Sequence, residues 1–388
     1  MKRRDFCRQS LLSALGIGAA VSTGTLAADL AQAGTPTKHQ PANNSVHMMG
    51  EGLFLSPADK ATAISALVAG DEFATDRYLI GGAVERLEIR MAELLGKEAA
   101  VFLPTGTLAN HLAIRVLAGP RRVAIAEDDS HLVNDAGDCL QALSGIRLET
   151  VAGPADVAGI EAALKRLRQR RFAPEVGVIS LESPSRRRFN AGLSREVLAS
   201  IRDLARREGI AVHLDGARLP MQCAHQDWDL QRACKYCDTV YVSLYKLYNT
   251  TAGAIVAGDS GTVAEIRKLR GPFGAVMYQA WPVAGVALGF CDDYAADYRA
   301  GLACYEQVAE RLVGSERLRI RPIENGTNAN WLQVTGGDSE RFVERLAERD
   351  VHILEPRPQW DGLLMMVNPT WARREPEDLV EAMMWAAG

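Results

Sequence analysis

The sequence has few cysteines, no strong excess of charge of one sign and no apolar run long enough to span a membrane. Its 388 residues include 7 cysteines, which are too few and too scattered for a disulfide framework. The odd number leaves at least one thiol unpaired. Cys234 and Cys237 form a C-x-x-C motif, but no second pair or histidine cluster completes a zinc site, so we interpret the motif as structural.

Charge and hydrophobicity are both ordinary. The chain has 44 Lys and Arg against 48 Asp and Glu, for a net charge of −4, and nothing in this balance indicates a nucleic-acid partner. Hydrophobic residues make up 47% and charged residues 24% of the chain, which is typical of a soluble globular protein. A chain of this length accommodates one large domain and a smaller one.

The N-terminal segment has the composition of an export signal. A basic start, "MKRRDFCRQS", precedes an apolar run over residues 11–26 that is shorter than the roughly 20 residues needed to cross a bilayer. Ala31-Gln32-Ala33 offers a cleavage site, and Arg3-Arg4 resembles the twin-arginine type. We therefore expect a signal over 1–33, a linker over 34–50 and a periplasmic protein without a membrane anchor. A disordered basic tail is the alternative.

Helical and strand-like patterns alternate after the linker. Strands are expected over 99–103, 123–126, 147–151, 176–181, 210–215 and 239–244, with helices over 83–95, 107–117, 160–168 and 195–208. This alternation predicts an α/β domain over 51–290, with a mainly parallel sheet between layers of helices. A long Ala-rich helical stretch from about residue 265 to 313 then leads into a small C-terminal α+β domain, so that 291–388 comprise a connecting helix and that domain. In such sheets, ligands bind at the carboxyl ends of the strands.

Two charged residues follow predicted strands. In "VHLDGARLP" an apolar run ends at Asp215, and Arg218 follows three residues later. A buried carboxylate is costly without a cation or a strong donor. Asp215 either forms an ion pair with Arg218 or faces the protonated pyridine nitrogen of pyridoxal phosphate, which needs such a partner to act as an electron sink. Lys246 stands in "SLYKLYN", at the rim of the expected core.

A turn and a histidine supply further candidates. In "LPTGTLANHLAI" a strand passes through Thr105, Gly106 and Thr107 into a helix, and the first amides of a helix can cradle a phosphate. A simple N-cap is the alternative interpretation. Ser243, three residues before Lys246, can add a phosphate donor. His131, in "DDSHLVND", is either a surface residue or a neutral imidazole that stacks on a cofactor ring or moves protons.

The order of these motifs resembles a known family. The successive stretches are "AELLGKEAAVFLPTGTLANHLAI", "DDSHLVNDAG", "IAVHLDGARL", "KYCDTVYVSLYK" and "LRGPFGAVMYQAWPVAGVALG". They are similar to motifs of the threonine aldolase and aromatic amino acid β-eliminating lyase family, within fold type I of the pyridoxal-phosphate enzymes. The resemblance implies that Lys246 forms the imine bond to the cofactor and that Asp215 pairs with its pyridine nitrogen. It also implies that His131 stacks on the ring and that Arg218 contacts the substrate carboxylate or the cofactor.

The resemblance also implies an activity. It implies that Gly106 and Thr107 hold the cofactor phosphate. The implied reaction is a retro-aldol step that cleaves a β-hydroxy-α-amino acid into glycine and an aldehyde. A small amino-acid-like substrate and a homodimer or homotetramer are expected. Elimination on another amino compound is the alternative, and a cofactor-binding protein without turnover is a third.

The substrate side departs from the family pattern. The stretch "MGEGLFLSP" places Glu51 or a neighbouring residue where the family has a serine that helps to bind the substrate carboxylate. A carboxylate-binding arginine of the family falls at Met365 or Met366, although Arg357 is near enough in sequence to replace it. A family histidine near the substrate hydroxyl corresponds to Ser185, and Tyr78 is a candidate contact in an altered segment. Each lost charge-assisted contact to a carboxylate removes roughly 1.5–3 kcal/mol of binding.

Overall fold

The computed structural model describes residues 44–69 and 74–388. The export signal expected over 1–33 and the first part of the expected linker lie outside the described residues. Among the residues that are described, no helix combines the length and apolar character needed to cross a membrane. The six cysteines of this part, Cys234 and Cys237 included, are all free thiols.

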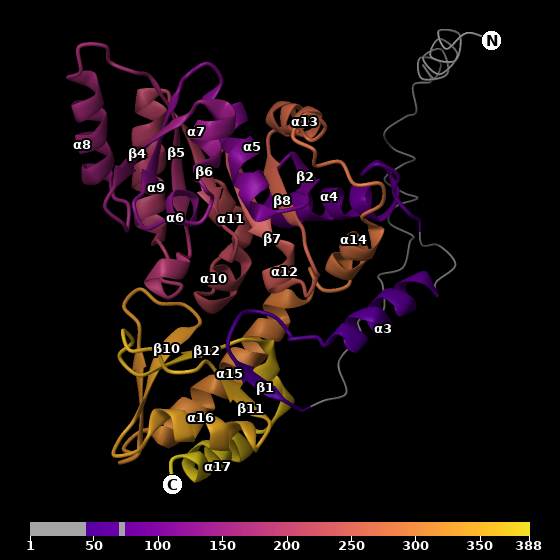
Figure 1. The fold of residues 1–388 in the computed structure, drawn as a ribbon, viewed down its shortest axis with the longest axis vertical. Helices are drawn as coiled ribbons and strands as arrows, with labels where there is room; N and C mark the ends of the chain where they lie inside the picture. Colours follow the sequence, from indigo (N-terminus) through magenta and orange to yellow (C-terminus); the bar gives the residue numbers. More distant parts are fainter. Residues whose placement is uncertain (1–43, 70–73) are drawn as a thin grey trace. The chain divides into compact units, whose positions relative to one another are not determined.

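A seven-stranded sheet forms the centre of the larger part (Figure 1). Its strands follow the order β2-β8-β7-β6-β5-β3-β4. β8 runs antiparallel to both of its neighbours, and the other neighbouring pairs are parallel. The bounds are β2 (Ala99–Leu103), β3 (Val123–Glu127), β4 (Arg147–Val151), β5 (Val176–Glu182), β6 (Ala211–Asp215), β7 (Thr239–Ser243) and β8 (Ala254–Gly258).

Helices cover both faces of this sheet. One face packs against α4 (Gly82–Leu95), α8 (Val157–Arg168), α9 (Arg195–Glu208) and α14 (Trp281–Leu288), with Phe102, Ile125 and Leu214 pointing into that core. The other face packs against α5 (Gly106–Ala118), α7 (Cys139–Ser144) and α13 (Ser260–Leu269). Neighbouring residues of one strand thus enter different cores, as the alternation of side chains in a strand requires. The expected α/β architecture with a mainly parallel sheet is confirmed.

Further helices lie before, between and after the strands of this sheet. They are α3 (Pro57–Val68), α6 (His131–Asn134), η1 (Arg186–Arg188), α10 (Leu219–His225), α11 (Leu230–Cys234), α12 (Leu244–Leu247) and α15 (Tyr294–Leu312). The helical stretch expected over 265–313 is not continuous. It contains the end of α13, then α14 and α15, because Gly271-Pro272 follows the first and Pro282 begins the second.

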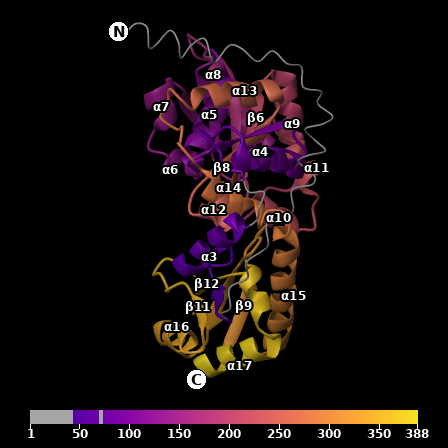
Figure 2. The same ribbon diagram turned by 90° about the vertical axis from the view of Figure 1, so that its right-hand side faces the viewer.

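The C-terminal elements form two small sheets with their own core (Figure 2). β9 (Leu318–Pro322), β10 (Ala329–Val334) and β12 (Leu363–Met366) are antiparallel, and β1 (Val46–Met48) pairs in parallel with β11 (Val351–Ile353). α16 (Ser339–Ala347), η2 (Pro369–Arg373) and α17 (Pro376–Ala386) complete this part. The linker expected over 34–50 therefore contains a strand at its end. Three residues are too short a run to signal a strand in the sequence.

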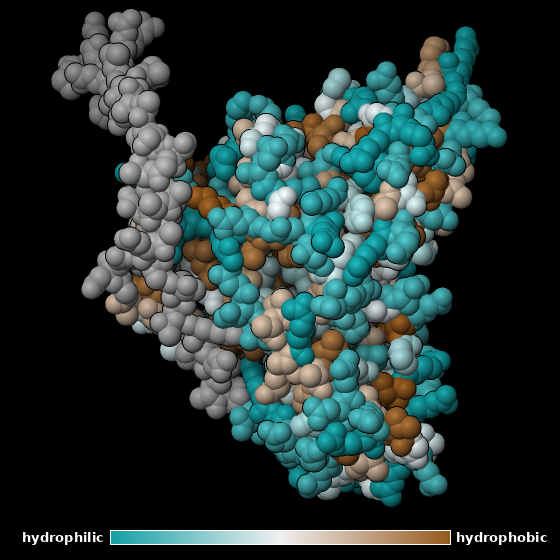
Figure 3. All heavy atoms as spheres, turned by 180° about the vertical axis from the view of Figure 1, so that it is seen from behind, coloured by the Kyte–Doolittle hydropathy of each residue, from teal (hydrophilic) through white to brown (hydrophobic). Residues whose placement is uncertain are grey.

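The face of the molecule seen in Figure 3 is mainly hydrophilic, with small separate hydrophobic areas. Tyr78 and Tyr278 are among the exposed large hydrophobic side chains, at 52% and 58%. Their rings meet edge to face, with centroids 5.3 Å apart, and the amide of Tyr78 donates to the carbonyl of Tyr278.

Candidate active site

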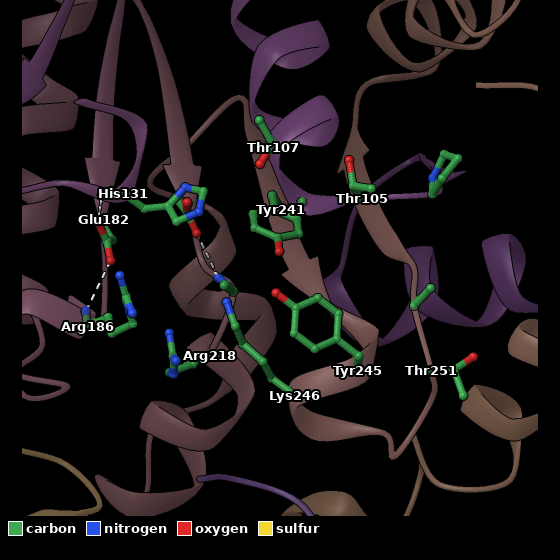
Figure 4. Close-up of a pocket in the computed structure, with 15 residues that line it drawn as sticks. Thr105, Thr107, His131, Glu182, Arg186, Arg218, Tyr241, Tyr245, Lys246 and Thr251 are labelled. Carbon is green, nitrogen blue, oxygen red and sulfur yellow. Dashed lines mark hydrogen bonds between the residues drawn. The ribbon is translucent and has the colours of Figure 1, made fainter. Parts of the chain in front are cut away.

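A cavity of about 330 Å³ lies at the carboxyl ends of the parallel strands. Seven residues that the sequence singled out line it together: Thr105, Gly106, Thr107, His131, Asp215, Arg218 and Lys246. Figure 4 shows the amine of Lys246 between Arg218 and Tyr245, with His131 on the same side of the cavity. Ser243 is fully buried and is not part of the lining, so its expected role as a phosphate donor stays a prediction.

Lys246 reaches the cavity because β7 ends at Ser243 and the short helix α12 follows at once. Its amine lies over the ring of Tyr245, 5.4 Å from the centroid. Burial, and after it the nearby charge of Arg218, lowers the pKa of Lys246 to about 8. A much larger fraction of this amine is therefore neutral and nucleophilic near pH 7 than of an ordinary lysine.

Asp215 ends β6 and is held by donors on both oxygens. The side-chain amide of Asn110 donates to Oδ2 at 2.6 Å, and the backbone N–H of Ala217 donates to Oδ1 at 3.1 Å. Asn110 Oδ1 lies 2.9 Å from Nε2 of His213, whose Nδ1 lies 2.8 Å from the hydroxyl of Thr239. Burial lowers the pKa of His213 to about 4, so this ring is neutral at physiological pH. The chain of hydrogen bonds fixes the carboxylate.

The sequence reasoning missed Asn110 and His213. Both are buried polar residues within mainly apolar elements, Asn110 on α5 and His213 on β6. Because a buried polar side chain must find a partner, that pattern was the signal available in the sequence. The position in which α5 packs on the sheet brings the two residues together, and local sequence patterns do not determine that position.

His131 is the first residue of α6, which Ser130 caps. Among the described residues, Nδ1 of His131 is a buried polar atom without a hydrogen-bond partner. Burial lowers the pKa of His131, and Asp215 opposes this shift only in part. The cavity therefore presents a neutral imidazole with a ring nitrogen available to a ligand.

Glu182, which the sequence reasoning also missed, ends β5 and lines the cavity. Its Oε2 accepts from the backbone N–H of His131 at 2.6 Å, and its Oε1 accepts from that of Arg186 at 3.1 Å. Burial, and then the charge of Asp215, raises the pKa of Glu182 to about 7. The carboxyl group thus holds the loop of His131 in place and is partly protonated at neutral pH.

Arg218 forms an ion pair inside the protein. Its Nε donates to Oε1 of Glu51 at 2.5 Å, and both side chains are at least nine-tenths buried. Burial alone would lower the pKa of Arg218, but the charge and hydrogen bond of Glu51 raise it above the ordinary value. The sequence left two partners open for Asp215, Arg218 and the pyridine nitrogen of the cofactor. In the structure Arg218 forms its ion pair with Glu51.

The turn before α5 has features of both a cap and an anion cradle. Thr105 is the N-cap, and its hydroxyl accepts from the amide of Leu108 at 3.3 Å. A Cβ added to Gly106 would lie 2.0 Å from the hydroxyl of Tyr241, so only glycine fits against that cavity-lining ring. Residues 105–107 of this helix start also line the cavity, where backbone N–H groups favour an anion.

The remaining sequence candidates lie elsewhere. Ser185 is fully buried, Met365 is buried in β12, and the sulfur of Met366 accepts from the amide of Gly50 at 3.2 Å. Arg357 is exposed and lies over the ring of Trp360. None of these, nor Tyr78, belongs to the lining of the cavity within the described part of the chain.

Comparisons with known proteins agree with this geometry. A family model described as beta-eliminating lyase matches residues 58–335. Low-specificity L-threonine aldolase 1 of Arabidopsis thaliana is 25% identical over 279 residues, covering 69% of this chain and 77% of that protein. Aldolase vrtJ of Penicillium aethiopicum is 28% identical over 311 residues, with 76% of each chain covered. The structure of Leishmania major threonine aldolase superposes with a TM-score of 0.66 at 16% identity, over 88% of this chain and 98% of that one. The expected fold type I architecture is confirmed.

The hydrogen-bonded chain behind Asp215 yields a stability prediction. Asn110→Ala removes one buried hydrogen-bond partner from Asp215 and one from His213, so we expect the free energy of unfolding to fall by roughly 1–3 kcal/mol. Denaturant unfolding followed by fluorescence measures this change. Asn134→Ala is the matched control, because its exposed amide bonds only the carbonyls of Asp128 and Ser130, which water can replace. Equal losses in the two variants would contradict the assigned role of Asn110.

Proposed function

The chain belongs to the beta-eliminating lyase family, and on this premise we propose which reaction this pyridoxal-phosphate-dependent lyase performs. The reaction is cleavage of the Cα–Cβ bond of a β-hydroxy-α-amino acid, or of a derivative of one, with release of an aldehyde. Relatives named threonine aldolases support this choice over elimination. One observation carries the proposal: a lysine with a pKa lowered to about 8 shares a cavity with a buried, hydrogen-bonded aspartate.

The cavity residues fit the cofactor. Lys246 would bond the cofactor's aldehyde carbon through its amine, and Asp215 would keep the pyridine nitrogen protonated. The start of α5 at residues 105–107, which lines the cavity, would hold its phosphate through backbone N–H groups. His131 has a buried nitrogen without a partner in the described structure, as a residue that lies against a ligand would have.

Bound pyridoxal phosphate supplies the electron sink that takes up the electrons of the breaking bond at Cα. The protein's own groups handle the protons. His131 is neutral because burial lowers its pKa, and it is the candidate to accept the proton of the β-hydroxyl. Glu182 fixes the loop that carries His131 through the N–H of that residue. Tyr245, 46% exposed, lies at the mouth of the cavity beside Lys246.

Replacing the lysine tests the assignment. Purified enzyme given pyridoxal phosphate should turn yellow and keep the colour through gel filtration, and Lys246→Ala should abolish both, because the covalent bond is lost. Lys235→Ala, on a lysine outside the cavity, is the control. Candidate substrates are then assayed for aldehyde, ammonia and keto acid in parallel. Ammonia with keto acid, and no aldehyde, would favour elimination over aldol cleavage.

The lowered pKa of Lys246 predicts a pH dependence. Only the neutral amine attacks the cofactor aldehyde, and the amine loses its proton as the pH rises through about 8. The rate at which the apoenzyme takes up the cofactor should therefore rise with pH, be half-maximal near pH 8 and level off above it. Stopped-flow absorbance measures this rate. A midpoint near 10.4, the ordinary pKa of a lysine, would show that the amine is not desolvated.

We also propose export through a twin-arginine signal and assembly into a homo-oligomer. The motif at Arg3-Arg4 supports the first, and the exposed pair of Tyr78 and Tyr278 supports the second. In a bacterial host, replacing both arginines by lysine should keep the protein in the cytoplasm, as cell fractionation measures. Light scattering should give a mass of at least twice 42.1 kDa less the signal, and a monomer would refute the assembly.

A further inference from the structure

The guanidinium of Arg218 lines the cavity but already has an anionic partner behind it. Its Nε donates to Glu51 at 2.5 Å, and the two side chains are 9% and 8% exposed. Glu51 itself is not part of the cavity lining. A ligand in the cavity therefore meets an arginine whose positive charge an internal carboxylate balances at close range.

Contacts from several segments hold Glu51 in this position. The hydroxyl of Tyr294, on α15, donates to the carbonyl of Glu51 at 3.1 Å. The next residues are fixed as well, since the amide of Leu53 donates to Oδ1 of Asn249 at 2.7 Å. A Cβ on Gly52 would lie 2.8 Å from that oxygen and 3.1 Å from the carbonyl of Lys246. The turn that carries Glu51 thus packs against the segment that carries the lysine, and an incoming anion cannot easily displace it.

The second guanidinium in the lining is paired too. Nη2 of Arg186 donates to Asp135 at 2.9 Å, and Arg187 donates to the other oxygen of the same carboxylate. The same cavity wall carries the carboxyl groups of Asp215 and Glu182. Lys246, the remaining cation of the lining, is committed to the cofactor in the proposed function. Within the described structure, the free carboxylate of a substrate would therefore enter a site whose arginines already have anionic partners.

We propose that the substrate bears an uncharged carbonyl group, such as a carboxamide, on its amine-bearing carbon in place of a free carboxylate. An arginine has five N–H donors, and a neutral carbonyl oxygen can accept from Arg218 without bringing a negative charge close to Glu51. A carboxylate at the same place gains little net attraction from Arg218, because the charge of Glu51 offsets it, and burying the carboxylate's own charge costs free energy that this pair does not repay. This inference rests on the proposed function, because it concerns the substrate of that same site.

Binding to the cofactor-loaded enzyme tests the proposal without any need for turnover. Glycine and glycinamide are titrated against wild-type holoenzyme, and the Kd is taken from the change in cofactor absorbance and referred to the concentration of unprotonated amine. We expect glycinamide to bind at least about tenfold more tightly than glycine. Glycine that binds as tightly as glycinamide, or more tightly, would overturn the inference.

A charge-removing variant sharpens this comparison. Glu51→Gln keeps the shape of the side chain but frees the charge of Arg218, so glycine should bind at least about tenfold more tightly than to wild type. Glycinamide should change by less than about threefold. Glu355→Gln, which removes an exposed carboxylate outside the cavity, is the matched control and should alter neither Kd. If Glu51→Gln fails to fold, the ratio of the two Kd values in the wild-type enzyme still tests the inference.

The outcomes separate this inference from the proposed function. A wild-type protein that never acquires the absorbance of a covalently held cofactor overturns the proposed function, and this inference falls with it. Normal cofactor absorbance with glycine preferred overturns the inference alone. The same holds if Arg186→Gln abolishes tight glycine binding, because Arg186 would then be the carboxylate site that the structure argues is occupied.

Discussion

Three carboxyl groups lie buried side by side at the ends of parallel strands, and the site depends on how the protein compensates for them. Glu127, Glu182 and Asp215 end β3, β5 and β6, with exposures of 0%, 5% and 6%. Glu182 and Asp215 are Cα partners in the sheet. Buried carboxylates so close together raise one another's pKa unless donors surround them. Each carboxyl group is therefore stabilised by donors from a neighbouring chain segment.

The compensation shapes the cavity. Glu127 pairs with Arg188 at 3.0 Å, and one of its oxygens accepts the amide of Glu182 itself. Glu182 in turn accepts two amides from the loops that carry His131 and Arg186. The loops that bear candidate catalytic groups are thus positioned by the strand-end acids. Arg218, which follows β6 and lines the cavity, is paired from behind by Glu51 of a turn outside the sheet, and at Glu51 the chain departs from its family pattern.

The sequence predicted the sheet well, because local patterns determine it. β2, β4 and α9 have the bounds that the periodicity indicated, and Lys246, Asp215 and His131 converge because the carboxyl ends of parallel strands meet at one edge. Ser243 is fully buried two residues after the cavity-lining Tyr241, so its role as a phosphate donor stays a prediction. The partner of Arg218 could not be found, because Glu51 lies 167 residues away and no local rule relates the two. The same limit applied to Asn110, whose partners depend on how α5 lies over the sheet.

The strand that precedes Glu51 also sets an order of events during synthesis. β1 is made among the first segments of the folded part, yet its partner β11 is among the last, with Val46 opposite Val351. A pairing over such a distance along the chain closes late in folding, even where N-terminal segments leave the ribosome first. The turn of Glu51 has contacts with Asn249 and Tyr294, but the strand just before it gains its partner only once nearly the whole polypeptide exists. An incomplete chain can carry the lysine, the aspartate and the histidine and still lack the strand pairing that precedes Glu51.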